Sequence, residues 1–463
     1  MTADIKPALD RAHALYYGGR YSDFLSTFAE RRAAGEHSPA TTILAAVALA
    51  RMQRAREAIE LLRPLEEPND WGLEIAIESL LLRSWAELVD RNPLRATACI
   101  ERAAALSAGL RDVEIPNRTA LCRALHAWSE RDIPRAEALA RVAMSSTKGA
   151  TFGPAAQIVG FAAASRGRYM QQISILEETL VRLDRCRHVD TWLEASLLQN
   201  ISGIVVDFAL PAVTRRLSER AQSIDWSEET AVQLYHILRS LAYARLYGSN
   251  PSAPLEYLER AENVVPSDAW RLLALLDRIL LSSELRVRRF VHGFDVASAL
   301  IEARNLAEAV DWSQAHGEEC FGLLMLADLL AAERPQDAAR YLARFRELKG
   351  NLSHSLMAYS DARWSAAEDY VEGVIAADLD LARGVAPIAG AFEFWEDVGY
   401  SWRAARAALK LHELTGERSY LDWAVRESRL YPFSWIGDAV TEARARRFVP
   451  LTGSGARRRG DEA

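Results

Sequence analysis

The sequence predicts an all-α protein built from stacked antiparallel helical hairpins. In its third quarter one unit recurs: an Asp, a Trp within two residues, an apolar-periodic helix, a turn and a second helix. Self-similarity at a period of 35 to 43 residues is typical of a helical-repeat array. Alternating β-branched runs bounded by turn residues, which would predict strands, are absent from the sequence. The recurring starts are Asp190, Asp225, Asp268 and Asp311, with Trp192, Trp226, Trp270 and Trp312.

Each Asp of this set is expected to cap its helix, because a carboxylate accepts the unpaired amide protons of a first turn. Each Trp is expected to pack one hairpin against the next. The alternative for the tryptophans is a stacking wall for a sugar or a base. Alanines at one place in the second helix give the same period independently: Ala58, Ala96, Ala136, Ala297 and Ala338.

Turn residues and apolar periodicity predict the helices of the N-terminal half in pairs. The corner Gly19-Arg20-Tyr21 recurs as Gly167-Arg168-Tyr169, with glycine ending one helix and tyrosine filling the gap between two. Lys148-Gly149 is expected to break the chain before the fifth pair. The expected helices include residues 5–18, 21–34, 41–52, 56–65, 70–90, 93–110, 135–144 and 154–166.

The repeat pattern is expected to span residues 1–350 and to loosen afterwards into irregular helical repeats over residues 351–449. A short last helix near 438–447 follows an aromatic turn and is expected to cap the open apolar end of the array. Residues 450–463 are rich in Gly, Ser and Arg and are expected to form a disordered tail. Further helices are expected over 355–377, 379–396, 403–414 and 420–430.

Composition excludes several classes of protein. The net charge of −7 argues against a nucleic-acid-binding surface, which needs a basic face. No apolar run approaches the roughly 18–20 residues that a membrane span requires. The four cysteines are far apart, so we expect no disulfide framework and no metal site, and a reducing cytoplasm. Only four of the 56 basic residues are Lys, which we attribute to a GC-rich, bacterial genome.

The hairpins resemble tetratricopeptide (TPR) repeats, above all the long, degenerate repeats of bacterial regulators of the MalT/LuxR type. This resemblance implies an α-solenoid of about nine to ten TPR-like hairpins in a right-handed superhelix with a C-terminal helical cap. The regulators also carry an ATPase and a helix-turn-helix, but the sequence shows neither motif. The matching residues are Gly19, Tyr21 and Phe28, then Gly167, Tyr169 and Leu176, then Ala242, Leu258, Ala261 and Pro266.

No catalytic motif occurs in the sequence, so we expect no enzyme activity and no cofactor. Asn200 matches a TPR position at which Asn often bonds the main chain of a ligand; a bond to a neighbouring helix is the equal alternative. A basic cluster around residues 286–292 could hold an acidic partner or form a solvated turn. The expected function is binding of a protein or peptide in a concave groove; the alternative is sensing of a small molecule. The candidate binding residues are Asn200, Gln199, Trp192, His236, Arg239, Arg286 and Arg289.

Overall fold

A computed structural model describes most of the chain, and the described part is helical. It contains 23 α-helices and two short 3-10 helices, and no strand occurs among the residues described. The all-α class predicted from the sequence is therefore confirmed. The described residues are 5–68, 71–110, 112, 114–186, 188–206, 208, 210–245, 253–265, 267–285, 294–312, 318–351, 361–430 and 435–445.

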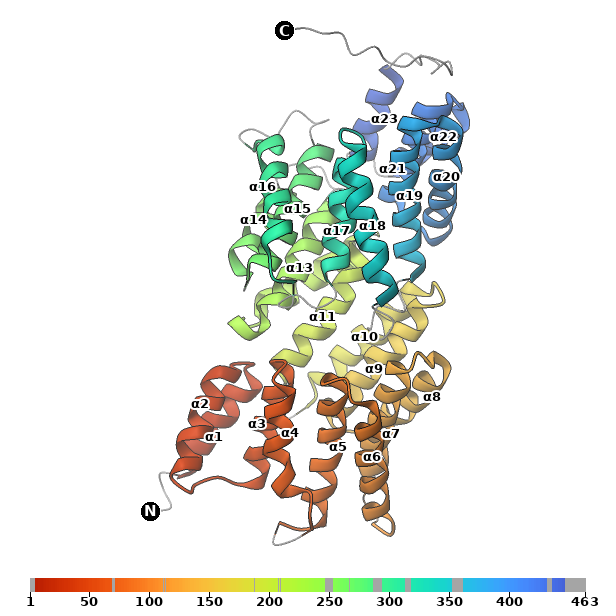
Figure 1. The fold of residues 1–463 in the computed structure, drawn as a ribbon. Coiled ribbons are helices and arrows are strands. Elements are labelled where there is room, and N and C mark those ends of the chain that lie inside the picture. The colour runs from red at the N-terminus through yellow and green to blue at the C-terminus, as the bar shows by residue number, and fades with distance from the viewer. Residues whose placement is uncertain are drawn as a thin grey trace. The chain divides into compact units, whose positions relative to one another are not determined.

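Consecutive helices form hairpins, which Figure 1 shows in chain order. In the N-terminal half the helices are α1 (Ile5–Tyr17), α2 (Tyr21–Ala33), α3 (Pro39–Arg51), α4 (Ala55–Leu62), α5 (Leu73–Val89), α6 (Pro93–Ser107), α7 (Glu114–Ser129), α8 (Ile133–Ala143), α9 (Gly149–Ala164), α10 (Tyr169–Leu183), α11 (Thr191–Val205) and α12 (Pro211–Ser223). The two 3-10 helices are Arg63–Leu65 and Glu228–Thr230.

The C-terminal half continues in the same way. Its helices are α13 (Ala231–Ala244), α14 (Ala253–Val264), α15 (Asp268–Leu285), α16 (Val296–Ala309), α17 (Glu318–Leu330), α18 (Pro335–Asn351), α19 (Asp361–Leu379), α20 (Leu381–Val398), α21 (Ser401–Thr415), α22 (Arg418–Leu430) and α23 (Trp435–Ala445). Helices α19 to α23 correspond to the five predicted beyond residue 350.

Contacts divide the chain into two compact units, which we describe separately. The first unit holds residues 1–204, 215–237 and 354–359, and the second holds 205–214, 238–353 and 360–463. The predicted change in regularity at residue 350, the capping role of the last helix, the number of repeats and the handedness of a superhelix stay predictions. The predicted tail, 450–463, lies outside the described residues.

Five successive hairpin corners in the first unit share one backbone conformation. The corner residue is left-handed, with φ between 61° and 73°, and the next amide donates to the carbonyl five residues before it, at 2.7–3.0 Å. This Schellman geometry satisfies the last carbonyls of the first helix. Glycine adopts it without steric cost, but only two of the five corners use glycine. The corner residues are Gly19, Gln53, Arg91, Arg131 and Gly167.

Small residues let the two helices of a hairpin approach closely. Five residues after the corner, Ala58, Ala96 and Ala136 are fully buried, as their recurrence in the sequence predicted. The fifth hairpin has Gln172 at this place, and a Cβ on Gly160 of α9 would lie 3.2 Å from it. The larger side chain is thus accommodated by a glycine across the crossing. The residues that precede the corners by seven positions are Ala12, Ala46, Ser84, Ala124 and Gly160.

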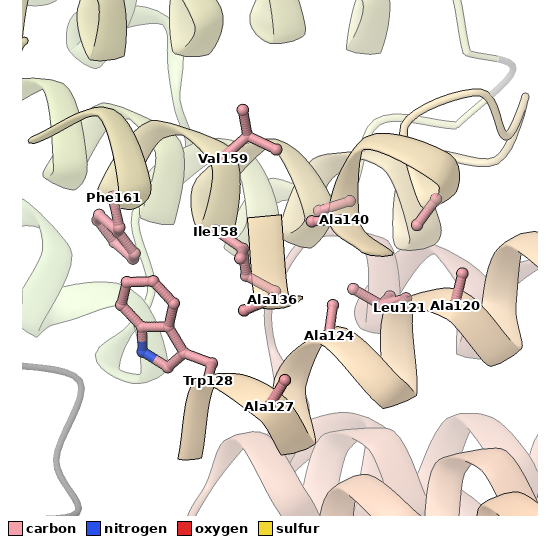
Figure 2. Close-up of a cluster of buried hydrophobic side chains, with 12 residues drawn as sticks. Ala120, Leu121, Ala124, Ala127, Trp128, Ala136, Ala140, Ile158, Val159 and Phe161 are labelled. Carbon is pink, nitrogen blue, oxygen red and sulfur yellow. The ribbon is translucent and has the colours of Figure 1, made fainter. Parts of the chain in front are cut away.

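The buried core is continuous between neighbouring hairpins. Figure 2 shows the cluster around α7, α8 and α9, in which the Trp128 ring is turned toward Phe161, with ring centroids 5.9 Å apart. In this cluster Ala124 of α7 and Ala136 of α8 are both fully buried. Each hairpin therefore completes its core with residues of the next, as expected for stacked repeats.

The structure corrects two of the four predicted helix starts. Asp190 caps a helix as predicted, with Oδ1 accepting from the Leu193 amide at 3.1 Å. After Asp225 the chain turns first, and Ser227 caps the short 3-10 helix. Asp268 is itself the first residue of α15. The residues that follow Trp312, 313–317, lie outside the described residues, so the start at Asp311 stays a prediction. An Asp near a predicted helix start therefore does not by itself identify the N-cap residue.

Two further predictions gave the wrong position: the start of α9 and the alanine at the helix crossing in α16. Helix α9 begins at Gly149 and includes Pro154, because Gly149 and Gly153 let Leu183 and Leu193 pack within about 3 Å of where a Cβ would lie. Ala297 is exposed, and the small residues that α16 buries are Ala299, Ala303 and Ala307. The predicted packing role of the tryptophans is observed at Trp312.

The Trp312 ring lies against α17. A Cβ on Gly322 would come within 2.7 Å of it, and Leu273 of α15 contacts the same place.

Among the helices that the structure describes, none is both long enough and apolar enough to cross a bilayer.

We predict that Arg131→Gly raises the free energy of unfolding by about 0.5–1 kcal/mol, because it removes a side chain from a left-handed corner. The measurement is urea denaturation of the full chain. Ala138→Gly, at an exposed position in the middle of α8, is the control and should lower stability by about the same amount. Equal losses in both variants would contradict the strain assigned to the corner.

Candidate functional site

The first helices of hairpins two to five expose one common side, here called the first-helix face. In each of these helices, the residues that lie nine and six positions before the corner residue are apolar. Residues three positions apart lie on one side of a helix, so the two residues belong to the same side. We call these positions the two apolar rows. One row is Leu44, Leu82, Cys122 and Ile158; the other is Val47, Trp85, Leu125 and Phe161.

The apolar rows are only partly covered. Leu44 and Val47 of α3, Leu82 and Trp85 of α5, and Leu125 of α7 are half-buried. Cys122, Ile158 and Phe161 are buried. The exposed part of the rows therefore spans three neighbouring first helices.

The other side of these helices faces the second helices. Arg123 of α7 bonds Glu101 of α6 at 3.1 Å, and His126 bonds Thr97 of α6 at 2.8 Å. At one edge of the rows, thirteen positions before the corner residue, α5 carries Glu78 and α7 carries Arg118. The side chains of Glu78 and Arg118 form an ion pair. The face thus has an apolar centre and a charged edge whose charges are already paired.

Arg51, at the end of α3, clamps the beginning of the first unit to α11. Its guanidinium donates to both carboxylate oxygens of Asp190, at 2.8 and 3.1 Å, and lies 4.5 Å from the centre of the Trp192 ring. It also bonds the Tyr21 hydroxyl and lies 5.7 Å from the centre of the Tyr16 ring. Both ionic side chains are almost fully buried.

Burial disfavours the charged guanidinium, but the charge and hydrogen bonds of Asp190 more than compensate and raise the pKa of Arg51 well above its usual value. The same burial raises the pKa of the Tyr16 and Tyr21 hydroxyls. The clamp therefore stays an ion pair over the physiological pH range.

Three further contacts close the same junction. The Ser227 hydroxyl donates to the Gly19 carbonyl at 3.0 Å, and the Ser22 amide donates to Glu229 at 2.7 Å. The Tyr17 and His188 rings stack with centroids 5.1 Å apart. The first two hairpins thus contact residues 188–229, which are separated from them in the chain by three complete hairpins.

These contacts join two first helices that are distant in the chain. Arg51 and Trp192 belong to the first helices α3 and α11, and α5, α7 and α9 connect these two in sequence through neighbouring contacts.

Three of the predicted binding residues lie on α11. Trp192 packs against the Arg51 guanidinium, and Gln199 lies two turns further along the same side of α11. Trp192, Gln199 and Asn200 are half-buried. His236 of α13 is half-buried beside Tyr235, with ring centroids 5.2 Å apart.

In the second unit, the predicted residue Arg239 takes part in a buried ionic network. Its Nε donates to Asp277 at 2.7 Å, and its guanidinium lies 4.4 Å from the centre of the Phe321 ring. The Tyr243 hydroxyl donates to the same carboxylate at 2.6 Å. Tyr243 also contacts Trp402 of α21, with centroids 5.5 Å apart, so first helices distant in the chain meet here too.

Glu318, in the first turn of α17, borders this network. Burial raises the pKa of its carboxyl to about 7; the positive charge of Arg239 lowers it in part, and Asp277 raises it. A carboxyl of this kind changes its charge near neutral pH. The remaining predicted residues of the second unit, Arg286 and Arg289, lie outside the described residues.

The sequence did not reveal Arg51 or the apolar rows. Both are defined by their distance from a hairpin corner. The corner at Arg131 can be located from Asp132-Ile133-Pro134, but Gln53 and Arg91 do not stand out as corner residues. The partner of Arg51 lies 139 residues away, beyond the reach of any local pattern.

Three thiols are buried and unsuited to nucleophilic chemistry. Burial raises the pKa of Cys99 and Cys122 to about 11 and that of Cys320 to about 12. Such thiols stay protonated at physiological pH, and only the thiolate is reactive. Within the described part of the chain, no three His, Cys, Asp or Glu side chains group as metal ligands.

The fold defines the class of the chain: an all-α protein of consecutive helical hairpins. No family model and no curated protein matches it. A Rap protein complexed with competence and sporulation factor matches 88% of the chain and 99% of its own length at 11% identity and a TM-score of 0.46. NprR in complex with its cognate peptide NprX matches 75% and 99% at 12% identity and 0.37. The Cut9–Hcn1 assembly of APC/C matches 96% and 90% at 13% identity and 0.29.

These TM-scores are low, so the ligand of this chain has to be inferred from its own residues.

We predict that Arg51→Met lowers the free energy of unfolding by on the order of 3–5 kcal/mol, because it leaves the Asp190 carboxylate buried and unpaired. The double variant Arg51→Met, Asp190→Asn should recover most of the loss, since Asn removes the charge and still caps α11. Urea denaturation measures all variants.

Arg54→Met is the matched control for the clamp. Arg54 pairs with Glu57 on the surface, and exposed pairs contribute about 0–1 kcal/mol. If Arg51→Met cost no more than Arg54→Met, the clamp would not hold the first unit together.

We predict that Glu318 makes the stability of the protein depend on pH. Its folded pKa of about 7 lies above the unfolded value, so the free energy of unfolding falls as pH rises from about 4.5 to 7, by about 3 kcal/mol. Glu318→Gln should therefore be more stable than the wild type at pH 7.5 and equally stable at pH 4.5. Glu319→Gln, next to it in α17, should retain the pH dependence; urea midpoints at the two pH values decide.

Proposed function

We propose that the chain is a non-catalytic helical-repeat module whose first unit holds a segment of a partner protein on its concave first-helix face. The observation that carries this proposal is the exposed part of the apolar rows, which lie on neighbouring first helices that Arg51 joins to α11. Partly exposed apolar surface of this kind marks interaction sites. Trp192, Gln199 and Asn200 extend the site onto α11.

The chemistry of the face favours a segment of a protein. The face carries Leu44, Val47, Leu82, Trp85 and Leu125, which favour apolar side chains over a polar metabolite. Recognition of protein segments on helical surfaces commonly uses such apolar anchors.

We propose no catalytic role for this face, because its side chains are aliphatic and aromatic and the charges of Glu78 and Arg118 at its edge form an ion pair. A regulatory role in a bacterium, of the kind that the MalT/LuxR resemblance implies, is the setting we propose for it. Cytoplasmic location and the small-molecule alternative stay predictions.

The proposal predicts that Trp85→Glu weakens binding at least tenfold, since it buries a charge against an apolar ligand. The probes are peptides of 20 residues selected from a random display library on the full-length wild-type chain. Fluorescence anisotropy gives the affinity of each selected peptide for the wild type and the variants. Thermal melting verifies that each variant is folded, and Leu125→Gln is a second, milder variant of the same face.

Leu94→Glu is the control, because Leu94 is 86% exposed on the second helix α6 and lies off the first-helix face. It should bind the selected peptides like the wild type. If no selected peptide loses affinity for Trp85→Glu and Leu125→Gln, or if Leu94→Glu loses as much, the face has been assigned wrongly.

A further inference from the structure

We propose that the first unit opens at the junction between α1–α4 and residues 188–230. Helices α1–α4 then move as one arm about their contact with α5, and the opening admits a partner segment to the apolar rows on α3. The opening itself is a property of the chain alone. Its role in admitting a segment rests on the proposed function.

Neighbouring hairpins of the first unit are held together by buried hydrocarbon. One buried cluster joins α3 and α4 of the arm to α5, and a second joins α5 to α6 and α7. Separating either interface would expose apolar side chains to water, at a cost in free energy that grows with their area. The first cluster includes the buried residues Ile43, Leu49, Ile59, Leu62 and Ala86.

The junction is held mainly by charged and hydrogen-bonded groups. Besides the Arg51–Asp190 ion pair, two hydrogen bonds join the corner of the first hairpin to residues 227–229. Among the described residues, the apolar cluster of α1, α2 and α3 receives one side chain from outside the arm, that of Trp192. The junction therefore differs in chemistry from the interfaces between neighbouring hairpins.

Opening the junction differs from removing one partner of its ion pair. When α3 and α11 separate, the guanidinium of Arg51 and the carboxylate of Asp190 both regain water, and this hydration offsets most of the attraction that is lost. The groups of the two hydrogen bonds regain water in the same way. The junction therefore opens at a lower cost in free energy than the apolar interfaces on either side of α5, which stay closed.

Opening also exposes part of the apolar rows. Leu44 and Val47 of the rows pack against the same buried cluster as Trp192, and Arg51 lies one turn beyond Val47 on α3. When the arm moves, Trp192 leaves this cluster together with Asp190. The end of the rows on α3 then becomes accessible to a partner segment.

Two equivalent corner glycines provide a way to control the opening. Gly19 and Gly167 have the same left-handed conformation, with φ of 73°. A Cβ on Gly19 would lie 3.3 Å from the Thr230 side chain across the junction. A Cβ on Gly167 would meet nothing within 4 Å. A side chain at residue 19 would therefore hold the junction open, and the same side chain at residue 167 would leave it closed.

Cysteine labelling of the full-length chain measures the opening. Thr230 is fully buried against Gly19, so Thr230→Cys places a thiol that N-ethylmaleimide reaches when the junction opens. The native thiols of Cys99 and Cys122 lie in the apolar cluster of α5, α6 and α7 and report on an interface between neighbours. Mass spectrometry of peptides gives the labelling rate at each site.

We expect the thiol of Thr230→Cys to be labelled roughly tenfold faster than Cys99 and Cys122, because the polar junction opens more often. Gly19→Asn in the same background should raise this rate further, and Gly167→Asn should leave it unchanged. Asn suits both positions because it tolerates the left-handed conformation. Circular dichroism verifies that each variant is folded.

Arg51→Met is a second variant, which removes the ion pair and leaves the corner intact. It should raise the labelling rate of the thiol of Thr230→Cys without changing that of Cys99. If this thiol is labelled no faster than Cys99, or responds equally to Gly19→Asn and Gly167→Asn, the junction does not open and the inference is wrong.

The role of the opening in binding is tested with the peptides selected for the proposed function. Their association rate, followed by stopped-flow fluorescence anisotropy, should rise with Gly19→Asn and stay unchanged with Gly167→Asn. An arm that opens without any change in this rate would overturn its role in admitting the segment. Peptides whose affinity does not depend on Trp85 or Leu125 would overturn the proposed function instead, and the labelling result would stand.

Discussion

The first unit depends on the buried ion pair between Arg51 and Asp190. A stacked array of hairpins needs contacts only between neighbours, and such an array can remain open. Here the Arg51 guanidinium, which contacts Asp190, two tyrosines and a tryptophan, joins α3 of the second hairpin to α11, the first helix of the sixth hairpin. Breaking such a pair leaves a charge without water or partner, so the junction tolerates few alternatives.

The second unit uses the same chemistry in another arrangement. Arg239 and Asp277 pair inside it, a tyrosine hydroxyl joins the carboxylate, and aromatic rings cover the guanidinium. Arginine suits both places because its planar, delocalised charge bonds two oxygens and stacks on rings at once. The scarcity of lysine, which we attributed to genome composition, is thus compatible with specific structural use of individual arginines. Arg239 was predicted as a binding residue, and it pairs with Asp277 and lies against Phe321 within its own unit.

The helices themselves were largely predictable, and the site was not. Apolar periodicity and turn residues located almost every helix to within a few residues, since both are local properties of the chain. Helix starts failed where several capping side chains compete, as at Asp225 and Ser227. The corners at Gln53, Arg91 and Arg131 were not recognised as left-handed, because packing imposes that conformation on residues that do not favour it. Without those corners the repeats could not be aligned, and the apolar rows went unnoticed.

The sequence by itself determined the all-α class and the hairpin period, because these follow from side-chain size and hydropathy at short range. Only the tertiary structure decided which sides of the first helices form one face. The reason is the range of the interactions: Arg51 lies 139 residues from Asp190, and Gly19 lies 208 residues from Ser227. A charged or polar residue can form a buried ion pair, form a surface ion pair or lie on a binding face. Which of these occurs depends on the distant helix that packs next to it in the fold.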